Sequence, residues 1–190
     1  MRALPYKRYS AGFTVTELVI VMTIVGILTA IGTPTFKYVT TSNRIAGEVN
    51  SLLGDMQFAR SEAIKNGATV SICTSSTGTA CSTSNANYWH EGWIVFLDLN
   101  GDGNYQPAND TILRTQPAFT STDTFITTAN PTYSAITYNR MGYAPTGHTT
   151  TITINLHNAT NISNFTRCLA ISPIGSASTE VFNAGSPACT

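Results

Sequence analysis

The chain has 190 residues, of which 42% are hydrophobic and 11% are charged. This length accommodates one globular domain with an appendage and excludes two full-sized domains with a membrane anchor. The formal net charge is zero, but Arg2, Lys7 and Arg8 precede residue 13, and the seven basic residues after them face ten acidic ones. From residue 13 onward the formal charge is therefore −3. A net negative charge argues against a protein that attracts nucleic acid by its bulk charge.

The first predicted element is a long apolar helix. Residues 13–33 read FTVTELVIVMTIVGILTAIGT, with Glu17 as their single charged side chain, and they approach the roughly 20 residues that span a bilayer. The basic residues before them are expected to stay in the cytoplasm. Gly12 precedes the apolar run, whereas the cleavage site of an ordinary secretory signal follows its apolar core. Cleavage after Gly12 would therefore leave the apolar helix on the mature protein.

The helix is predicted to continue past Pro34 as an amphipathic segment. Apolar or small side chains recur there at alternating steps of four and three residues, which places them on one helical face. Lys65 and Asn66-Gly67 supply a cationic last turn and a stop signal. The pattern predicts a helix over residues 13–66, about 80 Å long, with a kink at Pro34 and Gly32. The predicted core face comprises Ile45, Val49, Leu52, Met56, Ala59 and Ala63.

After residue 67 the hydrophobic period changes, and short apolar or alternating runs are bounded by Gly, Pro, Asn or Ser. These runs predict β-strands. One long helix followed only by strands predicts the α+β class, with the helix packed on one antiparallel sheet. A phosphate-binding glycine loop follows none of the runs. The predicted strands are residues 68–73, 92–97, 111–115, 135–139, 150–156 and 168–172.

The four cysteines fall into two local pairs, Cys73 with Cys81 and Cys168 with Cys189. Four cysteines permit three pairings, and these spacings do not resemble the CxxC pairs of a zinc or redox site. A membrane-targeted chain would place its head in an oxidising compartment, which favours disulfides over free thiols. We therefore expect the two local disulfides.

Residues 98–104, DLNGDGN, match the front half of an EF-hand-type calcium loop, with oxygen ligands at alternate positions and a glycine sixth. The twelfth position is Asn109 rather than a bidentate glutamate, and the same residue types form tight turns. A hairpin turn is favoured and calcium remains an alternative; no other cofactor is expected. The candidate ligands are Asp98, Asn100, Asp102 and Asn104.

Aromatic residues and histidines suggest no chemistry of their own. The three histidines are isolated in the sequence, and no serine or cysteine stands in a recognisable nucleophile motif. Enzymatic activity is therefore not expected. Four aromatic side chains could stack on nucleic-acid bases, but placement in the core is favoured. They are Trp89, Trp93, Tyr138 and Tyr143.

Residues 12–18, GFTVTEL, resemble the type III signal of type IV pilins and type II secretion pseudopilins. The resemblance implies that a prepilin peptidase cleaves after Gly12 and methylates the new amino group of Phe13. Glu17 would then be the fifth mature residue and would pair, in a filament, with the amino group of a neighbouring Phe13. An ionisable side chain within a membrane helix costs a few kcal/mol and normally finds a partner. Pro34 also falls where the family commonly has a proline.

The later part of the chain resembles the GspH/FimT-type (FimT/FimU-like) minor pilins and pseudopilins. The resemblance implies the pilin fold and four parts: a removed leader at 1–12, a transmembrane helix at 13–34, its amphipathic half at 35–66, and a disulfide-bonded β-rich head at 67–190. The matching segments are FARSEAI at 58–64, VSIC at 70–73, GWIVFLD at 92–98, ILR at 112–114 and ITYNRMG at 136–142.

The function that this resemblance implies is a minor pilin in the tip or initiating complex of a type IV pilus, supporting assembly, twitching and adhesion. The alternatives are a minor pseudopilin of type II secretion and a DNA-binding minor pilin for natural transformation. DNA is the least favoured, because Gly175-Ser176-Ala177-Ser178 lacks the two arginines usual in DNA-uptake members. Expected partners are major and minor pilins, the peptidase, the inner-membrane assembly platform and the membrane before assembly. The chain would cross the inner membrane once, with a periplasmic head, and then join the extracellular filament.

Overall fold

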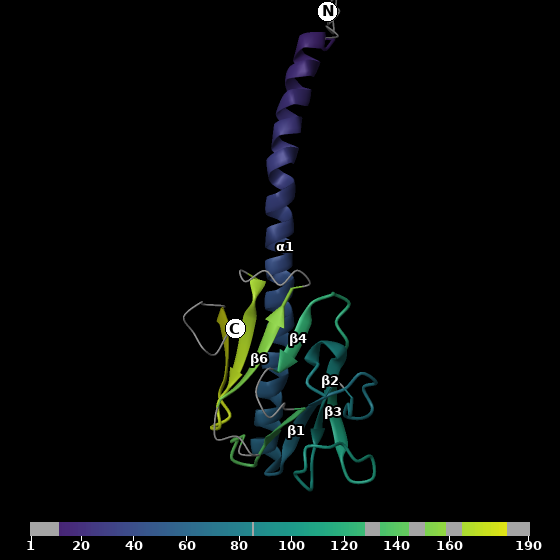
Figure 1. Cartoon of the computed structure of the whole chain (residues 1–190), viewed down its shortest axis with the longest axis vertical. Coiled ribbons are helices and arrows are strands. Elements are labelled where there is room, and N and C mark those ends of the chain that lie inside the picture. Colours follow the sequence, from purple (N-terminus) through teal and green to yellow (C-terminus); the bar gives the residue numbers. More distant parts are fainter. Residues whose placement is uncertain (1–11, 85, 128–133, 145–150, 159–164, 182–190) are drawn as a thin grey trace, which may run out of the picture. The chain divides into compact units, whose positions relative to one another are not determined.

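The computed structural model describes residues 12–84, 86–127, 134–144, 151–158 and 165–181. Within these residues the order is one long α-helix, a strand, a short 3-10 helix (Trp89–Glu91) and seven further strands (Figure 1). The chain divides into two compact units, Met1–Thr40 and Thr41–Thr190. The first unit holds the N-terminal part of the helix, and the second holds the rest of the helix and every described strand.

Helix α1 runs without interruption from Val15 to Asn66. It starts two residues later than predicted, because Thr14 caps it: the Thr14 Oγ1 accepts a hydrogen bond from the Glu17 amide at 3.2 Å. The helix ends at Asn66 and is followed by Gly67, whose φ of 60° lies in the left-handed region that glycine adopts without a Cβ penalty. The helix continues through Pro34, where the kink stays a prediction.

The predicted α+β class, a long helix followed by antiparallel strands, is confirmed, but the strands form two four-stranded sheets where one was expected. The first sheet has the order β3-β2-β1-β5 and the second β4-β6-β7-β8. Two strands of the second sheet, β4 and β8, were not predicted; both lie at its edges. The strands are β1 (Val70–Thr74), β2 (Gly92–Leu97), β3 (Thr111–Pro117), β4 (Thr124–Thr127), β5 (Ala135–Tyr138), β6 (Ile152–His157), β7 (Arg167–Ile171) and β8 (Ala177–Val181).

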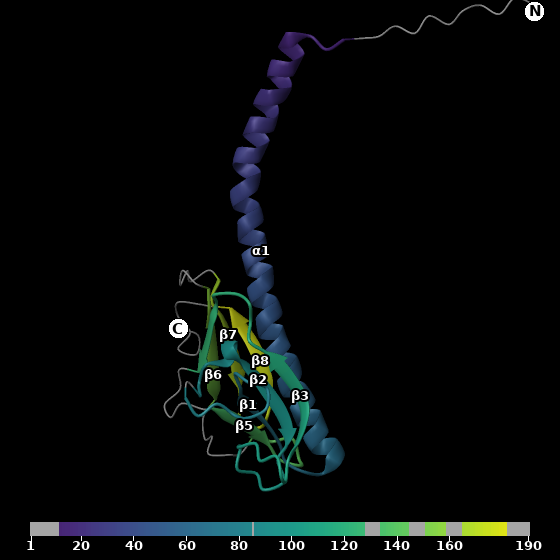
Figure 2. The same ribbon diagram turned by 90° about the vertical axis from the view of Figure 1, so that its right-hand side faces the viewer.

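One hydrophobic core joins α1 to both sheets, and Figure 2 shows the C-terminal part of α1 lying along the strands. All six residues of the predicted helical face are buried, with exposed fractions of 2% or less. They share the core with Ile72 and Val95 of the first sheet and with Ile154 and Leu169 of the second. Strand β1 is buried on both faces, since Cys73, Ile94 and Phe96 form a second cluster on the other side of the sheet. The predicted amphipathic face is thus confirmed, and it is the surface of α1 against which both sheets pack.

Buried aromatic residues tie the helix to the strands. Trp93 is fully buried, and its Nε1 donates a hydrogen bond to Asp55 Oδ2 of α1 at 2.9 Å. The other Asp55 oxygen accepts a bond from Arg114 Nη1 at 2.8 Å, and the Arg114 guanidinium lies 3.8 Å from the centre of the Phe58 ring. This network satisfies the polar groups of both the indole and the carboxylate at the edge of the core.

Core placement is confirmed for three of the four aromatic residues considered from the sequence. Trp89, Trp93 and Tyr138 are fully buried, and Trp89 Nε1 donates to Thr127 Oγ1 at 2.7 Å. Tyr143 is an exception, because its side chain is 45% exposed. Tyr143 lies after β5 and outside any strand, so its side chain does not follow the alternation between the two faces of a sheet that places strand residues in the core.

Candidate assembly site

The N-terminal end of α1 carries the predicted processing and assembly residues. The sequence Thr14-Val15-Thr16-Glu17 places a hydroxyl residue three positions before a glutamate, the pattern of a helix N-terminus. Besides the bond from the Glu17 amide, the Thr14 carbonyl accepts a bond from the Leu18 amide at 3.2 Å. Phe13 precedes this cap with 81% of its surface exposed. A Cβ placed on Gly12 would meet no atom within 4 Å.

Glu17 is the single charged residue in the apolar half of the helix. Its side chain is exposed, and it makes no ion pair with any described residue. Large hydrophobic side chains surround it, and those between Phe13 and Ile31 each have about half or more of their surface exposed. Exposure of so large an apolar surface to water is energetically unfavourable, so this part of the helix needs apolar surroundings. Among the described residues, α1 is the one helix long and apolar enough to cross a membrane.

Three threonine side chains in this half of α1 bond to carbonyls of their own helix. Thr23 Oγ1 donates to the Ile20 carbonyl at 2.7 Å, and Thr29 Oγ1 donates to the Val25 carbonyl at 2.9 Å. Thr33 repeats the pattern with the Thr29 carbonyl at 2.8 Å. Each hydroxyl therefore has an acceptor one turn back along the chain.

The disulfide between Cys73 and Cys81 is present, with an S–S distance of 2.05 Å, so the first predicted pairing is confirmed. Cys73 lies in β1, and the Cys81 sulfur accepts a hydrogen bond from the Tyr105 amide at 3.3 Å. Cys168 is also disulfide-bonded, but its predicted partner Cys189 lies outside the described residues.

The loop considered for calcium is an internally bonded turn. The Asp98 carboxylate is fully buried and accepts bonds from the amides of Gly101 at 2.7 Å and Gly103 at 2.9 Å, and from Ser71 Oγ at 2.6 Å. The Asp102 carboxylate accepts bonds from three neighbours, Asn104 N, Asn100 Nδ2 and Gln106 Nε2.

These bonds show that the loop satisfies its carboxylates within the turn. Backbone amides and side-chain N–H groups donate to the carboxylate oxygens of Asp98 and Asp102, and calcium binding at this loop stays a prediction. In the part of the chain that the structure describes, no group of three or more His, Cys, Asp or Glu side chains is placed to hold a metal ion. Asp98, Asn100, Asp102 and Asn104 form a turn of the kind that the sequence favoured.

The segment that corresponds to the arginine motif of DNA-uptake members is a tight turn. Gly175 has a φ of 77°, and a Cβ there would collide with the carbonyl of Gly142. The glycine is thus required by the close approach of a second turn. That second turn carries Arg140 and Met141, which sequence reasoning used only as part of a resemblance, and it is followed by Tyr143, for which a place in the core was favoured. The exposure of these three side chains has no sequence signal.

Comparisons with known proteins agree with this architecture. A family model described as type II transport protein GspH matches residues 48–175, and one for the prokaryotic N-terminal methylation motif matches residues 7–33. A crystal structure of the Pseudomonas aeruginosa type IV minor pilin FimU superposes with a TM-score of 0.56 at 22% identity, covering 73% of this chain and 89% of that chain. A second crystal form of FimU gives 0.53 at 21% identity, covering 71% and 91%. A comparison with curated proteins gave no match.

Proposed function

Because this chain belongs to the family of the type II transport protein GspH, we propose that it is a minor pilin of a type IV pilus. It would act in the tip or initiating complex and support assembly of the filament, with twitching and adhesion as consequences. Its role would be structural rather than catalytic. The fold that it shares with FimU, itself a type IV minor pilin, supports this choice.

The observation that carries the proposal is the contrast between the two halves of α1. Residues after position 44 bury one face in the head, whereas the half before it exposes large hydrophobic side chains around a single carboxylate, Glu17. An exposed apolar helix needs lipid or other helices around it. A subunit that moves from a membrane into a helical filament core would find one environment and then the other.

Residues near the N-terminus would have specific roles in processing and assembly. A prepilin peptidase would cleave after Gly12 and methylate Phe13, and the basic leader would hold the cleavage site at the cytoplasmic face with the head in the periplasm. In the filament, the Glu17 carboxylate would pair with the amino group of Phe13 on a neighbouring subunit. The match to the N-terminal methylation motif supports processing of this kind.

The runner-up is a minor pseudopilin of type II secretion. The description of the matching family as a type II transport protein favours it, and both candidates use the same signal, helix and head. They differ in the machine that receives the subunit, which would be a long surface pilus in one case and a short periplasmic filament in the other.

Deletion of the gene in its own host, followed by complementation, tests the two candidates. The pilus proposal expects loss of sheared surface filaments and of twitching, with secretion of folded proteins unchanged. The opposite result would assign the chain to secretion. A chain carrying Gly12→Val serves as the negative control, because an unprocessed subunit should restore neither function. If the deletion changes neither filaments nor secretion, the proposed function is wrong.

A further inference from the structure

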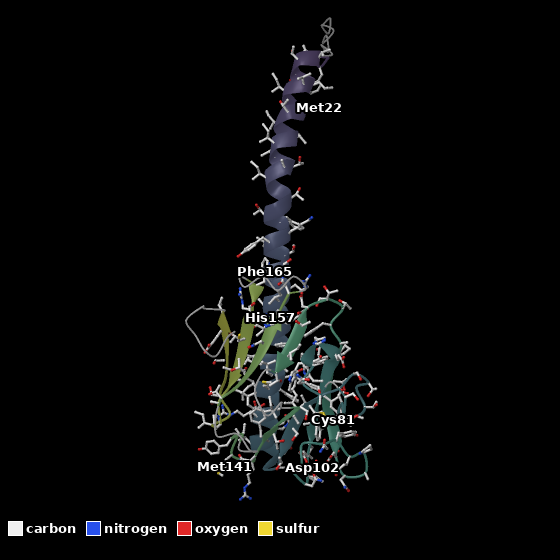
Figure 3. The ribbon with its side chains drawn as sticks, in the orientation of Figure 1. Met22, Cys81, Asp102, Met141, His157 and Phe165 are labelled. Carbon is white, nitrogen blue, oxygen red and sulfur yellow. A yellow bond between two sulfur atoms is a disulfide. The ribbon has the colours of Figure 1, made fainter. Side chains whose placement is uncertain are left out.

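Four large apolar side chains are exposed where two turns meet the C-terminal end of α1. Met141 and Tyr143 flank Gly142, and a Cβ on Gly142 would lie 2.8 Å from Ile64 Cδ1 of the helix. Ile174 precedes Gly175, where an added Cβ would collide with the Gly142 carbonyl. Figure 3 shows Met141 at the outer edge of the head. The exposed fractions are 53% for Ile64, 63% for Met141, 45% for Tyr143 and 61% for Ile174.

The backbone beneath these side chains is fixed by hydrogen bonds. Asn139 Oδ1 accepts bonds from the amides of Met141 at 2.9 Å and Tyr143 at 3.1 Å. The neighbouring turn closes through the Ser172 amide and the Ser176 carbonyl at 2.9 Å, and the Ala144 amide joins the two turns by donating to the Pro173 carbonyl at 3.2 Å. The apolar side chains are thus held outward on ordered turns, which lowers the entropic cost of binding a partner.

Two arginines border the apolar side chains. A Cβ on Gly142 would lie 3.0 Å from Arg60 Nε, and Arg140 is adjacent to Met141 in the sequence and exposed. Neither arginine makes an ion pair with a described residue, whereas Lys65 nearby on α1 pairs with Glu62 at 3.0 Å. We call this surface the turn patch; it comprises Arg60, Ile64, Arg140, Met141, Tyr143 and Ile174.

The turn patch is positively charged on a head that is negatively charged as a whole. From Thr41 onward the sequence has six basic and nine acidic residues. Three of the basic residues form ion pairs within the head: Arg44 and Arg114 pair with aspartates, and Lys65 pairs with a glutamate. Two unpaired guanidinium groups beside apolar and aromatic side chains have the composition of the energetically dominant part of a protein interface.

We propose that the turn patch is a docking face for the head of a neighbouring pilin-type subunit, one that is net acidic as this head is. The inference rests on the proposed function, because the neighbour is a subunit of the same filament. Acidic side chains of the neighbour would meet Arg60 and Arg140, and its apolar side chains would cover Met141 and Ile174. A protein is favoured over nucleic acid because the patch has four apolar side chains and two cations, whereas nucleic-acid sites depend on many phosphate contacts.

A photo-crosslinking amino acid in place of Met141, in the full-length chain in its own host, tests the proposal. A probe at Val181, which is 60% exposed and lies at the far end of β8 from the turn, is the matched control. We expect a crosslinked product with another filament subunit from position 141 and little or none from position 181.

Surface substitutions then test whether the contact depends on the patch. Arg140→Glu and Ile174→Asp should each lower the yield of the product about tenfold, as loss of an interface anchor does. Val181→Asp should leave it unchanged. Equal amounts of each variant with the Cys73–Cys81 disulfide formed would show that the head has folded, so that a lower yield reports docking.

The outcomes separate this inference from the proposed function. If the chain is found in sheared filaments but position 141 gives no more product than position 181, or the substitutions leave the yield unchanged, the docking face is wrong and the function stands. A nuclease-sensitive adduct from position 141 would assign the patch to nucleic acid instead. A chain that is absent from every filament overturns both.

Discussion

Arg44 and Asp123 form a bidentate ion pair that connects the loop between β3 and β4 to α1. Arg44 Nε lies 2.8 Å from Asp123 Oδ2, and Arg44 Nη2 lies 2.9 Å from Asp123 Oδ1. The aspartate side chain is fully buried, whereas that of the arginine is 46% exposed. The hydrogen bond to Asp123 raises the pKa of Arg44 above its usual value. Beside this pair, Ser121 Oγ donates to Glu48 Oε1 at 2.8 Å.

The first prediction is that Arg44→Met destabilises the head, because it leaves the Asp123 carboxylate buried without its cation. We expect a loss of about 2 kcal/mol, less than for a fully buried pair because Arg44 is partly screened by solvent. Thermal unfolding of the purified full-length chain measures it. Lys65→Ala, which breaks an exposed pair, is the control and should barely change the melting temperature. Equal effects of the two substitutions would contradict the role of the Arg44–Asp123 pair.

The second prediction concerns the pH dependence of stability at Glu48. Burial of its carboxyl, reinforced by the negative charge of Asp123, raises the pKa of Glu48 above 4.5, although the Ser121 bond and Arg44 oppose this. The folded head therefore favours the protonated form. The stability that this gives is fully present below about pH 4.5, the unfolded value, and is lost as the pH rises through the folded pKa.

Glu48→Gln removes this titration while keeping an oxygen for Ser121. The melting temperature of the wild type should therefore fall relative to that of the variant as the pH is raised from 4 to 8. His157 is present in both proteins, and burial lowers its pKa, so its opposite contribution cancels in the comparison. Parallel pH profiles of the two proteins would show that Glu48 does not titrate in this way.

The third prediction is that Gly12→Val blocks processing without disturbing the protein itself. A Cβ at Gly12 meets nothing within 4 Å, so any defect arises in the active site of the peptidase. Gly26 also has open space around a Cβ, and Gly26→Ala should be processed normally. Gel mobility and the mass of the N-terminal peptide distinguish precursor from methylated mature chain. A normal yield of mature Gly12→Val protein would remove the basis of the prepilin assignment.

The fourth prediction is that Glu17→Val leaves membrane insertion and cleavage intact but lowers incorporation into filaments at least roughly tenfold, since an ion pair in an apolar environment is lost. Helix capping should survive, because Thr14 Oγ1 bonds to the Glu17 amide and not to its side chain. Thr23→Val is the matched control. Membrane fractionation measures insertion, and immunoblots of sheared filaments measure incorporation. Unchanged incorporation of the Glu17→Val chain would falsify the charge-pairing role.

The fifth prediction is that replacing Cys73 and Cys81 together by alanine lowers the free energy of unfolding by about 2–3 kcal/mol, as expected for a short closed loop. Chemical denaturation under non-reducing conditions measures the loss. Peptide mapping without reduction should also link Cys168 to Cys189. A Cys168 peptide joined to any other cysteine would overturn the second local pairing.

Much of the helix could be predicted from the sequence, because its signals are local. The spacing of Ile45, Val49 and Leu52 repeats within a few residues and reports the buried face directly. The Cys73–Cys81 disulfide could likewise be predicted, since the two cysteines are only eight positions apart in the sequence. The late start of α1 at Val15 follows from the cap at Thr14, which the prediction did not consider.

The sheets and the tertiary contacts could not be predicted in the same way. Strand β8 has the exposed sequence ASTEV at an edge, so it lacks the alternation that marks a half-buried strand. Strand β1 pairs with both β2 and β5, and the second partner begins more than 60 residues later. Arg44 and Asp123 are 79 positions apart, and no local pattern indicates that they meet.

The threonine hydroxyls of α1 have a further consequence for the life cycle of the subunit. Because Thr23, Thr29 and Thr33 donate hydrogen bonds to carbonyls of their own helix, their hydroxyl groups need no hydrogen-bond partner outside it. A helix of this kind can pass from lipid to the interior of a filament without exchanging these three hydrogen bonds. Glu17 is the one charged side chain among residues 13–34, and under the proposed function it is the residue there that would have to find a new partner when the helix changes its surroundings.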